Sequence, residues 1–136
     1  MIKEFQSKFV AVVDGDTVIV DIDLGFNIWR KNCRIRLASI DTPELNTSEG
    51  KAAARWLWDH LGKIEWLTIV LHGTGEDKYG RVLGDIIVNT VNIGNLMLTL
   101  GIAKPYTGKG EKPWPEKNPV VTPMGLGSEN QEKSGS

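Results

Sequence analysis

The stretch FQSKFVAVVDGDTVIVDIDL, residues 5–24, decides the fold of this chain. Two runs rich in Val, Ile and Phe, at 5–13 and 17–24, are separated by Asp14-Gly15-Asp16, which is a tight-turn signal. The second run alternates, and its apolar face carries Val18, Val20, Ile22 and Leu24. Alternation with a period of two is typical of a strand that is buried on one side. The stretch therefore predicts a β-hairpin and favours a fold built from antiparallel strands.

Further strands and helices follow the hairpin. Residues 33–40 alternate again, and Pro43 ends that strand because proline has no N–H to give to a ladder. The apolar period becomes helical over 48–60. The remaining segments predict strands at 64–71 and 82–88 and a short helix at 92–100. Five short strands with few crossover helices favour a small barrel over a parallel sheet. We expect a mainly β fold, a five-stranded barrel with two or three helices.

Composition and charge limit the classes of protein that this chain can form. It has 136 residues and a mass of 15.0 kDa, the size of one domain. The 16 Lys and Arg residues nearly balance the 17 Asp and Glu residues, and the net charge of −1 excludes a histone-like binder. Any binding of nucleic acid must come from a focused site, with a shallow dependence on salt. One cysteine and two histidines leave little material for a disulfide or a zinc site.

The sequence gives no sign of a membrane protein. No apolar run approaches the roughly 20 residues of a membrane-spanning helix. Lys3 and Glu4 stand where a signal peptide would be apolar. We therefore expect a cytoplasmic protein without a membrane partner, and secretion from a longer precursor stays open.

The composition changes near residue 112. Four of the six prolines fall within 113–136, a polar segment that also contains glycine. Such a segment has too little apolar material to offset the entropy of ordering it. We predict a folded domain over 1–112 and an extended or disordered tail over 113–136, which Trp114 could pin to the domain. We expect a monomer.

Three charged, turn-forming segments together supply the groups needed to attack a phosphodiester, although each alone has a structural interpretation. Asp16 and Asp41 offer the hard oxygen ligands that suit Ca²⁺ or Mg²⁺. Glu44 is a third carboxylate, able to take a proton from water or to orient it. Arg36 and Arg81 are planar forks that match two phosphate oxygens and keep their charge. The set predicts metal-assisted hydrolysis of phosphate esters.

The same segments resemble the staphylococcal nuclease-like (thermonuclease) domains. The matching text is Asp14-Gly15-Asp16-Thr17, then Arg36-Leu37 with Asp41-Thr42-Pro43-Glu44, then Asp77-Lys78-Tyr79-Gly80-Arg81. Their order agrees with the family, and so does the five-residue step from Arg36 to Asp41. Three ordered motifs are far more specific than any one of them. The resemblance covers roughly residues 7–106 and implies a five-stranded OB-fold barrel.

The resemblance also implies a metal site and an attacking group. Asp16 and Asp41 are expected to ligate one Ca²⁺ ion, and the carbonyl oxygen of Thr42 is expected to be a further ligand. Glu44 is expected to activate or position the attacking water. The loop between Glu44 and the helix is shorter than the corresponding loop in the secreted, basic prototype of the family.

The substrate groups follow from the resemblance as well. Arg36 and Arg81 are expected to clamp the phosphate, and Lys78 and Tyr79 to contact the terminal phosphate of a bound nucleotide. Members of the family cleave DNA and RNA and leave 3′-phosphate ends. The resemblance implies a calcium-dependent endonuclease that prefers single-stranded or flexible substrate, since OB barrels suit exposed strands.

Two other functions stay open on the sequence alone. The first is a non-catalytic OB module that binds single strands, and the second is a structural OB domain that recruits a protein through the tail. Trp29, placed at a hairpin tip beside Arg30 and Lys31, could meet a nucleic-acid strand. The other tryptophans of the domain are expected to pack in the core or between helix and barrel: Trp56, Trp58 and Trp66.

Overall fold

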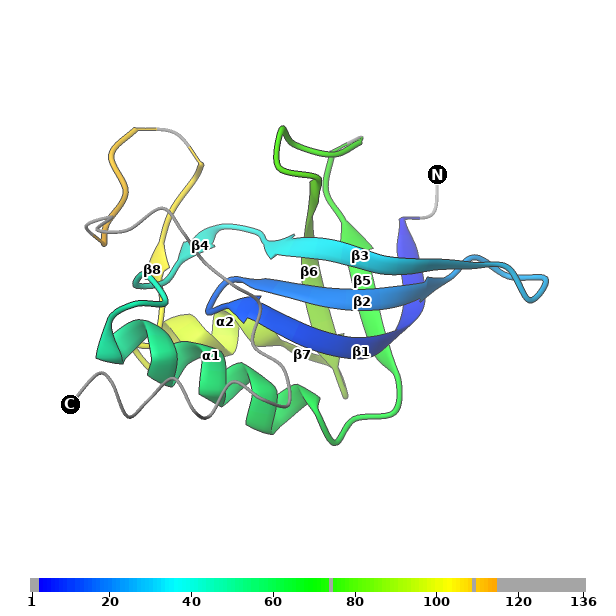
Figure 1. The fold of residues 1–136 in the computed structure, drawn as a ribbon, viewed down its shortest axis with the longest axis horizontal. Helices are drawn as coiled ribbons and strands as arrows, with labels where there is room; N and C mark the ends of the chain where they lie inside the picture. Colours follow the sequence, from blue (N-terminus) through cyan, green and yellow to red (C-terminus); the bar gives the residue numbers. More distant parts are fainter. Residues whose placement is uncertain (1–2, 74, 109, 115–136) are drawn as a thin grey trace.

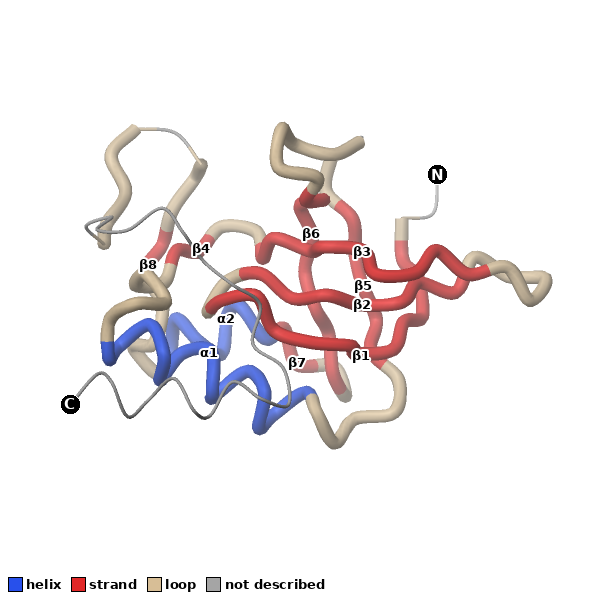
Figure 2. The backbone as a smooth tube through the Cα atoms, in the orientation of Figure 1, coloured by secondary structure: helices blue, strands red, loops and turns tan. Residues whose placement is uncertain are grey.

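The computed structural model describes residues 3–73, 75–108 and 110–114 (Figure 1). Two helices and a set of strands alternate along these residues, with the helices on one side of the strands (Figure 2). The elements are, in chain order, β1 Glu4–Asp14, β2 Thr17–Asp23, β3 Trp29–Leu37, β4 Ile40–Asp41, α1 Ser48–Leu61, β5 Leu67–Leu71, β6 Arg81–Val88, β7 Val91–Asn92, α2 Ile93–Thr99 and β8 Lys104–Pro105.

Five strands close into a barrel. The main sheet has the order β3-β2-β1-β5-β6-β7, and its neighbouring strands are antiparallel. An additional parallel pairing joins β3 to β6, with Ile35 opposite Val82 and Leu37 opposite Gly84. This pairing closes the ring β1-β2-β3-β6-β5. The predicted five-stranded OB-fold barrel with helices is thereby confirmed.

The barrel interior and one face of α1 form a single core. Alternate residues of the strands point inward and are fully buried, among them Val18, Val20, Ile35, Leu67 and Ile69. The helix adds a buried stripe with helical spacing, made of Ala53, Ala54, Leu57 and Leu61. Thr47 caps this helix, since its side chain accepts a hydrogen bond from the N–H of Gly50 at 3.0 Å. The stripe packs against β1.

The strands differ from the sequence expectation mainly at their ends. The third strand begins at Trp29 and stops at Leu37, and the exposed turn of its hairpin is residues 24–28. The fifth strand begins at Leu67, not at 64. The structure also contains two-residue strands, such as the pair β4 and β8, which are too short to show any periodicity in the sequence. The expected helix over 92–100 is found at Ile93–Thr99.

Two tryptophans do not lie where the sequence placed them. Trp29 is the first residue of β3 and not a tip residue, and Trp66 is 40% exposed and outside the core. Trp29 pairs with Asp23, the neighbour of the inward-facing Ile22, and Trp66 directly precedes the inward-facing Leu67. Since successive side chains alternate between the two faces, both tryptophans lie on the outside of the barrel.

The C-terminal part of the predicted domain packs across the end of the barrel. β8 pairs with β4, and the N–H of Tyr106 donates to the carbonyl of Ser39. The predicted tail lies outside the described residues from 115 onward. No helix in the described part of the chain has the length and apolar character needed to cross a membrane.

Candidate active site

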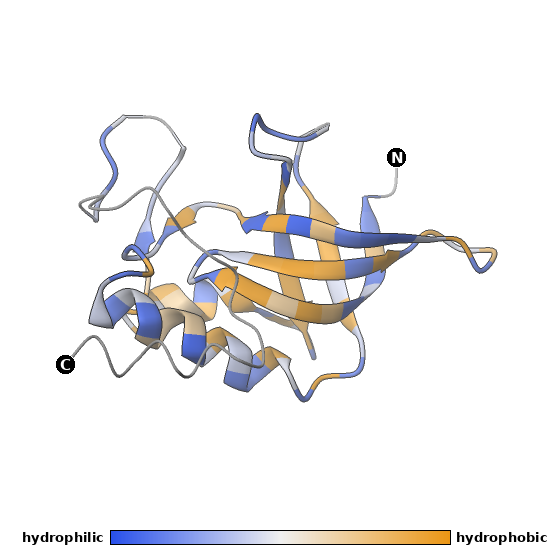
Figure 3. Cartoon of the chain, viewed as in Figure 1, coloured by the Kyte–Doolittle hydropathy of each residue, from blue (hydrophilic) through white to orange (hydrophobic). Residues whose placement is uncertain are grey.

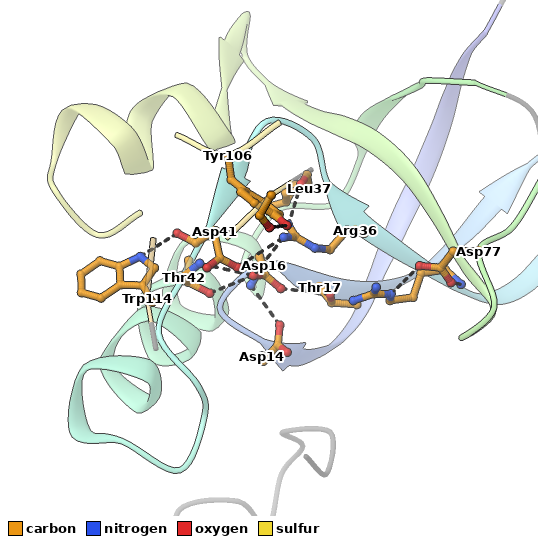
Figure 4. Close-up of polar contacts among 12 residues, drawn as sticks. Asp14, Asp16, Thr17, Arg36, Leu37, Asp41, Thr42, Asp77, Tyr106 and Trp114 are labelled. Carbon is orange, nitrogen blue, oxygen red and sulfur yellow. Dashed lines mark hydrogen bonds and ion pairs between the residues drawn. The ribbon is translucent and has the colours of Figure 1, made fainter. Parts of the chain in front are cut away.

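A cavity of about 880 Å³ opens at the end of the barrel where β2 begins and β3 ends. All eight residues that the sequence singled out line it: Asp16, Arg36, Asp41, Thr42, Glu44, Lys78, Tyr79 and Arg81. The structure therefore brings three segments that are far apart in the sequence to one place. Figure 4 shows polar contacts among residues of the cavity wall and its neighbours.

The turn between β1 and β2 positions Asp16. Its backbone N–H donates to Oδ1 of Asp14 at 3.1 Å, and its carbonyl accepts from the N–H of Leu37 at 2.8 Å. A side chain at position 15 would meet Thr42 at 2.6 Å, so glycine is required for the turn to approach the next segment. Asp16 is consequently held against the strand exit at 7% exposure.

Asp41 and Thr42 come from the exit of β4. The backbone N–H and Oγ1 of Thr42 donate to Oδ2 of Asp16 at 3.3 and 3.2 Å. The indole N–H of Trp114 donates to the carbonyl of Asp41 at 2.9 Å (Figure 4). The ammonium of Lys104 lies 4.0 Å from the centre of that indole ring. Asp41 is 3% exposed. These contacts hold Asp16 and Asp41 on one wall of the cavity.

Arg36 lies between the two carboxylates. Its Nη2 is 3.5 Å from Oδ2 of Asp16 and 3.5 Å from Oδ1 of Asp41. Its Nη1 donates to the carbonyl of Leu37 at 2.8 Å. The side chain is only 13% exposed, so the guanidinium is a mostly buried cation shared by two buried carboxyl groups.

The acids of this cluster respond differently to their surroundings. Burial alone acts to raise the pKa of Asp16, but the charge of Arg36 and the hydrogen bonds from Thr42 hold this pKa below its ordinary value. Burial and the charge of Asp16 raise the pKa of Asp41. Burial and the same neighbouring charge raise the pKa of Asp14 well above its ordinary value. The carboxyl groups of Asp14, Asp16 and Asp41 thus share the charge of one guanidinium, that of Arg36.

Glu44 lines the cavity from the loop before α1 and is partly buried. Its carbonyl accepts from the N–H and from Oγ1 of Thr47, at 3.0 and 2.7 Å. A Cβ at Gly50 would stand 1.8 Å from the same carbonyl, so only glycine lets the helix approach this loop. The first turn of α1 therefore anchors the backbone of Glu44.

Arg81 approaches the cavity from the other side, at the start of β6. Its Nε donates to Oδ2 of Asp77 at 2.8 Å, and its guanidinium carbon lies 5.1 Å from the centre of the Tyr79 ring. Oδ1 of Asp77 also accepts from the N–H groups of Tyr79 and Arg81. Burial acts to raise the pKa of Asp77, but these hydrogen bonds lower it below its ordinary value. Asp77 thus shapes the loop and orients Arg81.

Sequence reasoning missed other residues of the cavity wall, and two of them belong to the C-terminal segment. Tyr106 and Lys112 line the cavity, and the charge of Lys112 acts to lower the pKa of Asp41. Both belong to the segment after β8, which carries no periodicity and no motif. The signal that pointed there was Trp114, and its bond to Asp41 explains how this segment reaches the site.

The donor set fits a hard cation. Two carboxylates and backbone oxygens are the ligands that Ca²⁺ prefers, and its six to eight ligands leave room for water and substrate. Within 3–73, 75–108 and 110–114, no three His, Cys, Asp or Glu side chains form a ready-made cage. The residues present thus fit an open oxygen site, with Asp16 and Asp41 as the side chains that would hold the ion.

Fold and site together define a class: an OB-fold barrel whose end carries acidic side chains and two arginines in one cavity. Comparison with known families agrees with this class, since the family model for staphylococcal nuclease homologues matches residues 34–120. The chain belongs to the family of staphylococcal nuclease homologues. The Asp14–Thr17 turn precedes the matched span, and the structure joins it to that span through Thr42.

Relatives of the chain come from plants and bacteria. An "Uncharacterized 38.1 kDa protein" of Capnoides sempervirens is 34% identical over 126 residues, which are 90% of this chain and 36% of that protein. A rice protein named "Probable staphylococcal-like nuclease CAN1" is 35% identical over 65% of this chain and 26% of its own length. A "Micrococcal nuclease" of Shigella flexneri is 29% identical over 79% of this chain and 62% of its own length. The chain thus spans less than two thirds of each of these relatives.

Proposed function

We propose that this protein is a calcium-dependent nuclease that hydrolyses phosphodiester bonds of DNA and RNA and leaves 3′-phosphate ends. One observation carries the proposal: Asp16, Asp41 and Arg36 converge in a cavity that Glu44 and Arg81 also line. Membership of the nuclease family and the nuclease names of two relatives support it.

Each residue has a distinct task in the proposed reaction. When bound, Ca²⁺ supplies Lewis-acid stabilisation of the phosphoryl oxygens and neutralises the acidic cluster. Arg36, relieved of part of its pairing with Asp16 and Asp41, donates to a phosphoryl oxygen as negative charge grows there. Arg81, held through Nε by Asp77, has its terminal nitrogens left to meet the phosphate from the opposite wall.

Glu44 handles the attacking water. The water oxygen bonds to phosphorus while the carboxylate of Glu44 orients the water and accepts a proton from it. The bond from phosphorus to the 5′-oxygen breaks, and this oxygen leaves as a hydroxyl with a proton taken from solvent. Lys78 and Tyr79, from the loop opposite, contact the terminal phosphate of the bound nucleotide. The protein acts as a monomer, on flexible single strands whose backbone can reach the cavity.

A digestion experiment tests the proposal. Labelled single- and double-stranded DNA and RNA are incubated with the protein in Ca²⁺, in Mg²⁺ or in EDTA. We expect cleavage in Ca²⁺, fastest on single strands, weaker cleavage in Mg²⁺ because of its stricter octahedral geometry, and none in EDTA. Undiminished cleavage in EDTA would eliminate the metal mechanism, and binding without cleavage in any metal would favour a non-catalytic module.

A matched pair of variants separates the catalytic carboxylate from a nearby one. Glu44→Gln should abolish cleavage while single-strand binding persists, because the amide cannot accept the proton. Glu49→Gln, at an exposed position in the first turn of α1, should leave cleavage unchanged. Equal activity of the two variants would remove Glu44 from the mechanism.

A further inference from the structure

Two indole rings meet on the outside of the barrel, far along β3 from the cavity. Trp29 starts β3 and Trp66 directly precedes β5, so β2 and β1 lie between them in the sheet. Their rings nevertheless stack, with centroids 6.0 Å apart and planes 27° apart. Neither belongs to the core cluster, and Trp66 is 40% exposed. The pair thus forms an aromatic surface on this face of the sheet.

Two lysines accompany the rings. Nζ of Lys8 lies 4.8 Å from the Trp66 ring centre and 6.0 Å from that of Trp29, and Nζ of Lys31 lies 5.6 Å from the Trp29 ring. Lys31 is also 3.3 Å from a carboxylate oxygen of Asp21. Lys8 has no carboxylate partner among the residues that the structure describes. We call Lys8, Trp29, Lys31 and Trp66 the tryptophan platform.

Cationic side chains connect the platform to the cavity. Cys33, Ile35 and Leu37 of β3 point into the core, so the alternate residues Arg34 and Arg36 point outward. Hydrophilic bands accordingly run along β3 in Figure 3. Both arginines line the cavity, and Arg34 has no ion pair within the described ranges. From Trp29 to Arg36 the strand covers about 23 Å at roughly 3.3 Å per residue.

We propose that the tryptophan platform binds the same nucleic-acid strand as the cavity, beyond the phosphate that is cleaved. This inference rests on the proposed function. Exposed indoles stack on bases of any sequence, and cations along the path meet the phosphates, which is how OB barrels hold single strands of about 4–16 nucleotides. The platform adds affinity for long strands, and a mononucleotide in the cavity cannot reach it.

The strand-length dependence of binding tests this proposal. Binding of fluorescent oligothymidylates of about 4 and about 16 nucleotides is measured in EDTA, so that no cleavage occurs and the result does not depend on catalysis. Trp66→Leu should weaken binding of the long strand by about 10-fold and leave binding of thymidine 3′,5′-bisphosphate unchanged. Trp56→Leu is the matched control, because Trp56 stacks on His60 of α1, and it should change neither.

A second variant keeps the test valid if Trp66→Leu unfolds. Lys8→Gln removes one exposed cation, so it should lower the slope of log K against log salt by about 0.7 for the long strand. Equal long-strand affinity and salt slope in wild type, Trp66→Leu and Lys8→Gln would overturn the proposal. Binding to vesicles of phosphatidylserine and phosphatidylcholine is measured as well. If Trp66→Leu removes vesicle binding and leaves oligonucleotide binding intact, the platform proposal is also overturned. Absence of cleavage with length-dependent binding would reject the nuclease and keep the platform.

Discussion

Replacing Arg36 by methionine should destabilise the protein far more than the same change at Arg81. The Arg36 side chain is 13% exposed, and its loss leaves the carboxylates of Asp16 and Asp41 and the carbonyl of Leu37 without their cationic partner. Breaking a buried pair in this way costs about 3–5 kcal/mol of unfolding free energy. The contacts of 3.5 Å are long, so we expect a value near the lower end, ~3 kcal/mol.

Arg81→Met is the matched control for this prediction. Its partner Asp77 is 38% exposed and Arg81 itself 28%, and an exposed pair contributes about 0–1 kcal/mol. Urea unfolding in EDTA at neutral pH measures both losses, provided that the m-value is unchanged. Arg36 lowers the pKa of Asp16 in the folded protein. The ion pair therefore stabilises the fold fully above the ordinary pKa of a carboxyl group, and this stabilisation is lost as the pH falls through the lowered pKa of Asp16. The difference in unfolding free energy between wild type and Arg36→Met should therefore become smaller in acid. Equal losses in the two variants would refute the account of a buried, doubly paired arginine.

Other expected outcomes concern turnover, the C-terminal segment and acid stability. Arg36→Lys and Arg81→Lys should each lower turnover by about 10²–10³ with a smaller effect on substrate binding, because lysine keeps the charge and loses the fork; near-normal turnover in both would contradict their catalytic assignment. Trp114→Phe removes the donor to the Asp41 carbonyl, so it should lower the unfolding free energy measured in urea by about 1 kcal/mol. It should also weaken Ca²⁺ binding in a calorimetric titration, and an unchanged Ca²⁺ affinity would show that this segment does not support the site. Asp77→Asn should lower the unfolding free energy at neutral pH and progressively less below pH about 3.9, because the contacts that lower the pKa of Asp77 stabilise only its ionised form. A loss of unfolding free energy that is constant between pH 7 and pH 2 would exclude this linkage.

Local pattern was enough to predict most elements, and the charged motifs together with the family resemblance singled out eight residues that line the cavity. The hairpin around Gly15 and the helix capped by Thr47 form as their sequences indicate, because turn chemistry and periodicity are short-range signals. The eight singled-out residues share one cavity because their motifs stand at strand ends that barrel closure brings together. Their chemical roles stay predictions until the variants are measured.

Long-range geometry explains what the sequence could not show. The parallel pairing of β3 with β6 joins residues almost fifty positions apart and leaves no periodic trace. Trp29 and Trp66 meet across two intervening strands, so nothing near either residue in sequence indicates a shared surface. Likewise, the burial of Arg36 depends on Asp16, which belongs to another hairpin.

The parallel pairing of β3 with β6 has a consequence for the order in which the barrel and its cavity form during folding. This pairing places Arg34 opposite Arg81, so the two walls of the cavity are joined only when the ring of strands is complete. Pairings between distant segments form late, because the entropy of loop closure must be overcome before they stabilise the chain. During refolding, the helical circular-dichroism signal should return first and the proposed nuclease activity last. If the proposed function holds, a partly folded chain that carries all of these side chains should not cleave nucleic acid.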